Sequence, residues 1–157
     1  MSTFKPSYAG ASALAITLNS LPSGAAWQSA VVDNTSIGAD DFQIGGAITT
    51  VSGSGLASNA VVYIYAYASV DGTNYTDGAT GADASYTMLT TPNLRLVAVV
   101  NVNASGAAAY WGIASIATAF GGFVPAKWGL VAVNETGLAL GASGNDIYYN
   151  AVNETSS

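Results

Sequence analysis

Residues 60–69 alternate in a pattern that constrains the fold more than any other segment. Tyr63, Tyr65 and Tyr67 fall on one side of the predicted strand, and small or branched apolar residues fall on the other. A period of two is typical of a β-strand, in which successive side chains point to opposite faces. Because both sides are apolar or aromatic, we expect both faces of this strand to be covered by other parts of the chain.

Further strand-like segments follow along the chain, separated by turn residues. Residues 94–102 are rich in Val and Leu, which predicts a strand buried on both sides. Gly45-Gly46 indicates a bulge or a close backbone contact. Residues 110–120 are predicted as a strand, with a short helix over 113–120 as the alternative. The predicted strands cover residues 12–18, 27–33, 42–51, 60–69, 86–89, 94–102, 110–120, 128–133 and 147–152.

This spacing of strands and turns favours an all-β fold, namely a β-sandwich that is jelly-roll-like. Residues 1–9 contain Pro6 among small polar neighbours, and we predict a short extended N-terminal arm there. Residues 10–157 are predicted to form a single β-sandwich domain. A chain of 157 residues is long enough to bury a core without disulfides or structural metals.

The residue types that carry most enzyme chemistry are scarce. The chain has no histidine and no cysteine, and its only basic residues are Lys5, Arg95 and Lys127. Histidine is the usual proton carrier near neutral pH and the commonest metal ligand, and a serine nucleophile needs a base beside it. We therefore predict that the protein is not an enzyme and holds no catalytic residue, metal or cofactor.

The charge balance bears on the possible partners. Binding to nucleic acid requires many Lys and Arg side chains to neutralise phosphates, and three cations in a chain of net charge −6 do not supply them. The same shortage disfavours an anionic membrane surface. Charged residues make up 8% of the chain, against about 25% in typical soluble domains. We expect part of the surface to be covered by other subunits.

One loop has the spacing of a possible calcium site. The pair Asp71-Gly72 begins a tight turn, and Asp71, Asn74 and Asp77 supply oxygen atoms at intervals of three residues. The loop lacks the full ligand set of a calcium-binding loop. The favoured interpretation is a polar hairpin in which these side chains bind their own backbone.

The aromatic residues allow two interpretations. Trp27, Trp111 and Trp128, together with nine tyrosines, can form a platform on which sugar rings stack. Aromatic side chains also fill sandwich cores and subunit interfaces, and that is their more general use. We therefore favour core or interface positions for the tryptophans over a glycan site.

Five short motifs lie within about residues 60–135, namely VVYIYAY at 61–67, DGTNY at 71–75, NLRL at 93–96, AFGG at 119–122 and PAKWG at 125–129. With these motifs the sequence resembles small virion structural proteins of tailed bacteriophages. Such proteins include capsid decoration, or cement, proteins, which are β-sandwich domains on the major capsid lattice and are often trimers. The resemblance implies no catalytic function.

The resemblance implies a role, a location and partners. The role is a decoration protein that binds the outside of a bacteriophage capsid and stabilises it. Its partners would be the major capsid protein and further copies of itself, as a homotrimer. It would be made in the cytoplasm of the bacterial host and located on the virion. The matching residues Arg95 and Lys127 become candidates for structural ion pairs. The candidate interface residues are Phe4, Lys5, Tyr8, Trp27 and Trp128.

An alternative function belongs to a different class. The three tryptophans and nine tyrosines are also compatible with a receptor- or glycan-binding β-sandwich module of a phage head or tail fibre. Exposure of the aromatic rings distinguishes the two hypotheses, because a stacking platform needs rings that face solvent.

Overall fold

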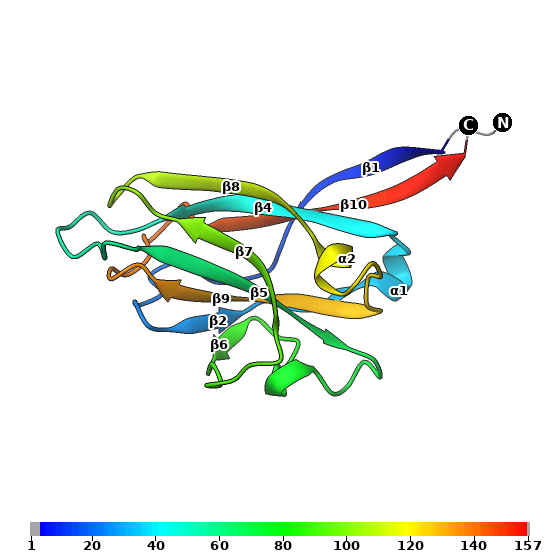
Figure 1. Cartoon of the computed structure of the whole chain (residues 1–157), viewed down its shortest axis with the longest axis horizontal. Coiled ribbons are helices and arrows are strands. Elements are labelled where there is room, and N and C mark those ends of the chain that lie inside the picture. Colours follow the sequence, from blue (N-terminus) through cyan, green and yellow to red (C-terminus); the bar gives the residue numbers. More distant parts are fainter. Residues whose placement is uncertain (1–3, 157) are drawn as a thin grey trace.

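The computed structural model describes residues 4–156, so the first three residues of the predicted arm and Ser157 lie outside the described range. The protein is nearly all β, with two antiparallel sheets packed together, which confirms the predicted all-β sandwich (Figure 1). Sheet A contains, in spatial order, β1 (Phe4–Ala13), β10 (Asp146–Ser156), β4 (Asp41–Thr49) and β8 (Ala108–Ser115).

Sheet B forms the second layer. It contains, in spatial order, β6 (Ala84–Tyr86), β2 (Ala26–Gln28), β9 (Lys127–Glu135), β5 (Val61–Ser69) and β7 (Arg95–Asn101), while β3 (Val32–Asp33) also pairs with β9. Three short helical turns complete the structure, namely α1 (Asn34–Ile37), the 3₁₀ turn η1 (Thr76–Gly78) and α2 (Ile116–Ala119). Within residues 110–120, both the predicted strand and the alternative helix are therefore partly right, because a strand is followed by a single helical turn.

The core lies between the sheets and is built around Trp128. The ring of Trp128 is 5.0 Å from that of Phe42 and 6.0 Å from that of Tyr149, measured between centroids. Ile44 and Ile64 are fully buried in the same cluster. Aromatic and branched side chains of this size remove enough apolar surface from water to hold the two layers together. The side chain of Trp128 is therefore a core residue.

Two glycine positions allow close contacts between neighbouring strands of the same sheet. The predicted irregularity at Gly45-Gly46 is confirmed, because the register of β4 and β8 shifts between Ile44 and Gly45. A Cβ atom on Gly45 would lie 2.9 Å from the carbonyl oxygen of Trp111 on β8. On β9, a Cβ atom at Gly129 would overlap the ring of Tyr67. Both positions require glycine because a neighbouring group occupies the space.

The outer face of sheet B is partly covered by the chain itself. Residues 70–94, which include η1 and β6, pack over this face and bury Tyr67, Val131 and Ala79 in a second apolar cluster. The prediction for residues 60–69 is therefore right for Tyr67, while Tyr63 and Tyr65 remain half-buried. We call residues 70–94 the cover segment.

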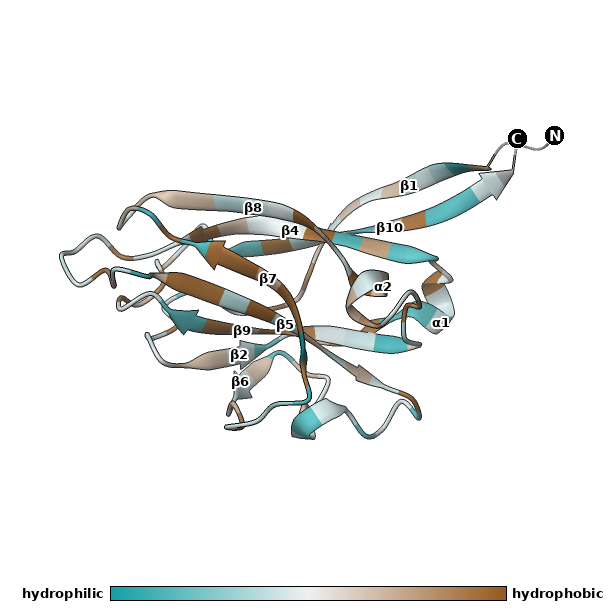
Figure 2. Ribbon diagram, viewed as in Figure 1, coloured by the Kyte–Doolittle hydropathy of each residue, from teal (hydrophilic) through white to brown (hydrophobic). Residues whose placement is uncertain are grey.

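The prediction that residues 94–102 are buried on both sides is wrong. Leu96 is 52% exposed and Val99 is 43% exposed. The reason is that Leu96 pairs with Tyr65 and Val99 with Tyr63, so both point to the outer face of sheet B, at its last strand. Figure 2 shows that β7 is nevertheless as hydrophobic along much of its length as the more central strand β5.

Candidate functional site: an uncovered sheet face

The two ends of the chain pair to form a ribbon. β1 runs antiparallel to β10 from the pair Phe4–Ser156 to the pair Ala13–Tyr148, across the predicted boundary between arm and domain. β4 pairs with β10 only as far as Val152, so the end of the ribbon has two strands and projects from the body (Figure 1). Every residue of β1 is exposed. A two-stranded ribbon is only marginally stable in water, so we expect it to contact another molecule.

The free edge of the ribbon is protected against pairing with a further strand. Pro6 has no backbone N–H, and the register of β1 shifts between Tyr8 and Ala11. Within this bulge the amide of Gly10 donates to the side-chain oxygen of Asn150, at 2.9 Å. These are features by which proteins block edge-to-edge association. The ribbon is therefore suited to contacts through its faces.

The outer face of sheet A is apolar and uncovered. Residues paired directly across neighbouring strands lie side by side on one face of a sheet. The pairs Tyr8–Val152, Tyr148–Gly45 and Ala47–Tyr110 therefore continue one surface from the ribbon to β8. We define the open face by its large exposed side chains, which are Phe4 (66% exposed), Tyr8 (53%), Tyr110 (84%), Ile113 (76%) and Tyr148 (44%).

The open face carries little charge at its centre. Gln43 and Asn150, paired on β4 and β10, are polar but neutral. The acidic residues Asp146 and Glu154 lie towards opposite ends of β10. Asp41, which pairs with Val152, lies at the end of β4, and its carboxylate accepts hydrogen bonds from the amides of Phe42 and Ala117. Contiguous apolar patches of this kind are rare on monomeric proteins and mark sites of association. Exposed tyrosines in particular provide large contact areas with a polar tip.

The structure separates the five predicted interface residues. Phe4 and Tyr8 belong to the open face, and Lys5 is exposed on the opposite side of the ribbon, because neighbours in a strand alternate. Trp27 is half-buried, and its Nε1–H donates to Asp83. Trp128 is fully buried in the core, so its assignment to an interface is wrong. Because Trp128 lies in a central strand and points between the sheets, its ring fills the core and cannot reach a partner.

Sequence analysis missed three members of the open face, Tyr110, Ile113 and Tyr148. A signal was present for Tyr148, since it follows the apolar Ile147 in an alternating strand and therefore points away from the core. Ile113 carried no such signal, because it is the residue left unpaired at the register shift between β4 and β8.

Of the two residues proposed for structural ion pairs, one is paired. Nζ of Lys127 lies 3.8 Å from the carboxylate of Asp33. The hydroxyl and amide of Thr35 also donate to this carboxylate, and together with Lys127 they hold the pKa of Asp33 below its usual value. Arg95 is exposed at the start of β7 and has no ion-pair partner within residues 4–156.

The Asp71 loop is built as a turn. The carboxylate of Asp71 accepts hydrogen bonds from the amides of Asn74 and Thr73, both at 2.8 Å, and from the hydroxyl of Ser69 at 3.0 Å. These donors lower the pKa of Asp71 well below its usual range. Asp77 points elsewhere and binds Asn93. The described residues contain no group of three acidic side chains that could hold a metal ion, and the polar-hairpin interpretation is supported.

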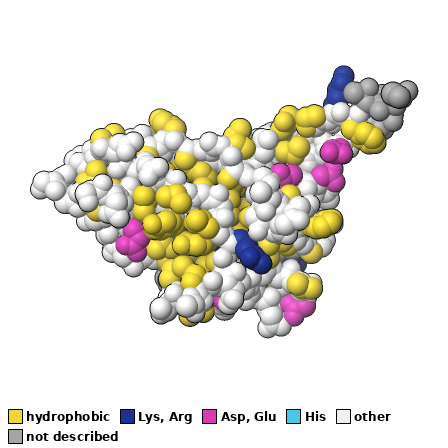
Figure 3. Space-filling view, viewed as in Figure 1, with side chains coloured by type: hydrophobic (Ala, Val, Ile, Leu, Met, Phe, Trp, Pro, Cys, Tyr) yellow, Lys and Arg dark blue, Asp and Glu magenta, His cyan; other side chains and the backbone are white. Residues whose placement is uncertain are grey.

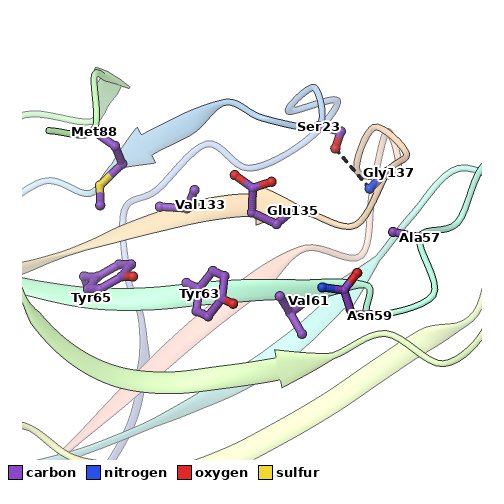
Figure 4. A pocket seen from close by; sticks show the side chains of 10 residues that line it. All are labelled: Ser23, Ala57, Asn59, Val61, Tyr63, Tyr65, Met88, Val133, Glu135 and Gly137. Atoms are coloured by element: carbon purple, nitrogen blue, oxygen red, sulfur yellow. Dashed lines mark hydrogen bonds between the residues drawn. The ribbon is translucent and has the colours of Figure 1, made fainter. Parts of the chain in front are cut away.

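A second candidate site lies where the cover segment stops short on sheet B. Tyr63 and Tyr65 on β5 and Glu135 on β9 line a groove of about 550 Å³, with Met88 of the cover segment at its side (Figure 4). The rings of Tyr63 and Tyr65 are 6.2 Å apart between centroids. Aromatic rings beside a carboxylate are a common setting for a polar ligand. Here the accessible rings belong to tyrosines rather than to the predicted tryptophans.

Comparison of the chain with protein-family models, curated proteins and solved structures found no match. Within residues 4–156, no helix has the length and hydropathy needed to cross a membrane. The two outer faces, with the ribbon, are thus the features from which a function can be inferred.

Proposed function

We propose that this protein is a capsid decoration protein of a tailed-bacteriophage virion, which binds the outer surface of the capsid and stabilises it. The resemblance of residues 60–135 to virion structural proteins motivates this role. The observation that carries it is the open face, a sheet surface with five large exposed apolar side chains and a projecting ribbon. An isolated copy would expose this apolar surface to water, whereas neighbouring proteins in an assembled shell would cover it.

The energetics of association favour the open face over the rest of the surface. Tyrosine is among the residues that contribute most to binding when an interface desolvates it. Tyr8, Tyr110 and Tyr148 are spread over the open face, and glycine or alanine residues such as Gly45 and Ala47 lie between them. Small residues between large ones leave hollows beside protruding side chains, and a partner can match this shape. The part of the open face around Tyr110 and Tyr148 would bind the major capsid protein.

The tyrosine with a strongly raised pKa, Tyr67, has a role in the fold. The pKa of Tyr67 is raised to about 12 because its ring is buried. Its hydroxyl donates to the backbone carbonyl of Ser29 at 2.7 Å, deep in the second apolar cluster. A buried tyrosine whose proton is held by a backbone carbonyl stabilises the fold.

The test is electron cryomicroscopy of phage particles assembled with this chain. We expect density for the protein on the outside of the capsid, and we expect the double variant Tyr110→Asp/Tyr148→Asp to lose it, because two carboxylates cannot be desolvated in an apolar contact. Phe123→Asp is the matched control, since Phe123 is 80% exposed and lies outside the open face. Density on the tail alone, or equal occupancy of both variants, would contradict the proposal.

The groove on sheet B favours a second candidate function, a glycan-binding module of a head or tail fibre. Tyr63 and Tyr65 supply rings, and Glu135 supplies a hydrogen-bond acceptor. This second function would replace the first if the protein were found on a fibre and bound neutral glycans on an array, and if substitution of Tyr63 abolished that binding.

A further inference from the structure

The edges of the two sheets meet along one side of the sandwich and expose apolar side chains there. β7 is an edge of sheet B, β8 is an edge of sheet A, and the two strands contact each other. Leu96 and Val99 on β7 are exposed, as are Tyr110 and Ile113 on β8. Neither strand contains a proline or a lysine, although the pairing of each has a register shift. Apolar strand edges tend to associate with other chains, so this side of the sandwich is a candidate contact surface.

A cleft runs between these two edges. It has a volume of about 560 Å³, and Leu96, Val97, Ile113 and Ala114 are among the residues that line it. Val97 and Ala114 also pack against the main core, so the cleft opens onto the interior of the sandwich. Figure 3 shows hydrophobic side chains gathered on this side of the molecule, over β5 and β7. Ile113 also lines a hollow with Tyr148, which joins the cleft to the open face.

The ribbon of the same chain has the complementary properties. Its face with Phe4 and Tyr8 is apolar and projects where its own body cannot cover it. Glu154 pairs with Pro6 and therefore lies on that same face. Arg95, beside the cleft, is a cation without a partner in the described part of the chain. One surface thus offers apolar side chains and an anion, and the other offers an apolar cleft and a cation.

We propose that the ribbon of one copy binds in the β7–β8 cleft of a second copy, with Phe4 and Tyr8 against Leu96 and with Glu154 near Arg95. The contact joins different surfaces of the two copies, so it is head-to-tail and can close into a ring. Apolar surfaces with one ion pair allow copies of net charge −6 to meet without strong repulsion. The inference goes beyond capsid binding, because the copies would meet in the absence of a capsid.

The experiment uses two complementary variants of the purified chain and light scattering. The ribbon variant is Phe4→Asp/Tyr8→Asp, and the edge variant is Leu96→Asp/Ile113→Asp, since both of these exposed side chains line the cleft. We expect the wild type to be an oligomer and each variant alone to be a monomer. An equimolar mixture should form a heterodimer, because the edge variant supplies an intact ribbon and the ribbon variant an intact cleft. Val70→Asp is the matched control, since Val70 is fully exposed elsewhere, and it should leave the oligomer intact.

Cysteine cross-linking gives a second measurement that does not depend on disrupted variants. The chain contains no cysteine, so a mixed disulfide between Tyr8→Cys in one copy and Ile113→Cys in another reports the designed contact, while each variant oxidised alone is the control. A mixed disulfide dimer is expected under mild oxidation. A monomeric wild type, a ribbon variant that stays oligomeric, or the absence of the mixed dimer would each overturn the inference. None of these outcomes bears on capsid binding, which the Tyr110→Asp/Tyr148→Asp variant tests separately.

Discussion

The outer faces of the two sheets carry similar residues but have opposite surroundings. On sheet B, Tyr67 points outward from β5 and is fully buried, because the cover segment packs over it. On sheet A, Tyr148 points outward from β10 and is 44% exposed, with no segment above it. Both side chains are tyrosines in well-paired strands. The cover segment, residues 70–94, makes the difference, because it buries one tyrosine in a core and has no counterpart over the other. Such connecting segments run over the surface of globular domains.

This difference shows how one chain can keep one apolar face for folding and leave the other for association. A face that the chain covers itself contributes to the stability of the monomer. A face that it leaves open contributes only when a partner arrives. On the proposed function the low charge of the whole chain has the same explanation, since surface that a partner buries cannot carry uncompensated charge.

The largest expected effect contrasts the two tyrosines directly. Tyr67→Ala should lower the free energy of unfolding by about 3–5 kcal/mol, because it removes a buried ring and leaves a cavity. Tyr148→Ala should change it by about 1 kcal/mol or less, since its side chain is largely in water. Urea unfolding of the two purified variants measures both. Equal losses would mean that the two faces do not differ in the way described.

A smaller effect is expected from loosening the cover segment. The carboxylate of Asp77 accepts hydrogen bonds from the amides of Asn93 and Leu94 and so ties η1 to the end of the segment. Asp77→Ala should cost about 1–3 kcal/mol through these lost bonds. Amide hydrogen exchange in residues 70–94 should become faster, while exchange in sheet A should not. Asp77→Asn, which keeps an acceptor and tolerates the left-handed backbone there, is the control.

The smallest effect concerns pH and again distinguishes the covered face. The pKa of Asp71 is lowered in the folded state by the amides of Asn74 and Thr73. A carboxyl group with a lowered folded pKa contributes stability above its unfolded pKa of about 3.9, and that contribution is lost as the pH falls towards the folded pKa. The urea midpoint of the wild type should therefore fall more between pH 6 and pH 3 than that of Asp71→Asn. Identical pH dependence would exclude this role for Asp71.

Much of the fold was predictable because the signals are local. The strand at residues 60–69, the bulge at Gly45-Gly46 and the turn at Asp71 follow from side-chain alternation and from backbone preferences of a few neighbouring residues. Residues 12–18 and 27–33 were predicted less well. The first is strand only as far as Ala13, and the second is divided between β2 and β3. In both cases contacts with distant strands, not the local pattern, decide where pairing stops.

The candidate site was less predictable because it depends on partners far apart in sequence. Phe4 and Tyr8 were expected at an interface, and they are exposed on the open face. Trp128 was expected there too, but β9 lies between two strands under cover on both faces and buries its ring. The residues Tyr110 and Tyr148 join the open face only because β8 and β10 both neighbour β4.

The sequence by itself determined the period of the strands, the positions of the main turns and the scarcity of groups able to do chemistry. Each of these depends on residue types and their near neighbours, which the chain carries into any fold. The tertiary structure alone decided that β1 pairs with β10, that residues 70–94 cover sheet B, and that sheet A stays open. Those outcomes depend on contacts between segments distant along the chain. The pattern of neighbouring residues does not specify which distant segment pairs with a strand or packs over a sheet.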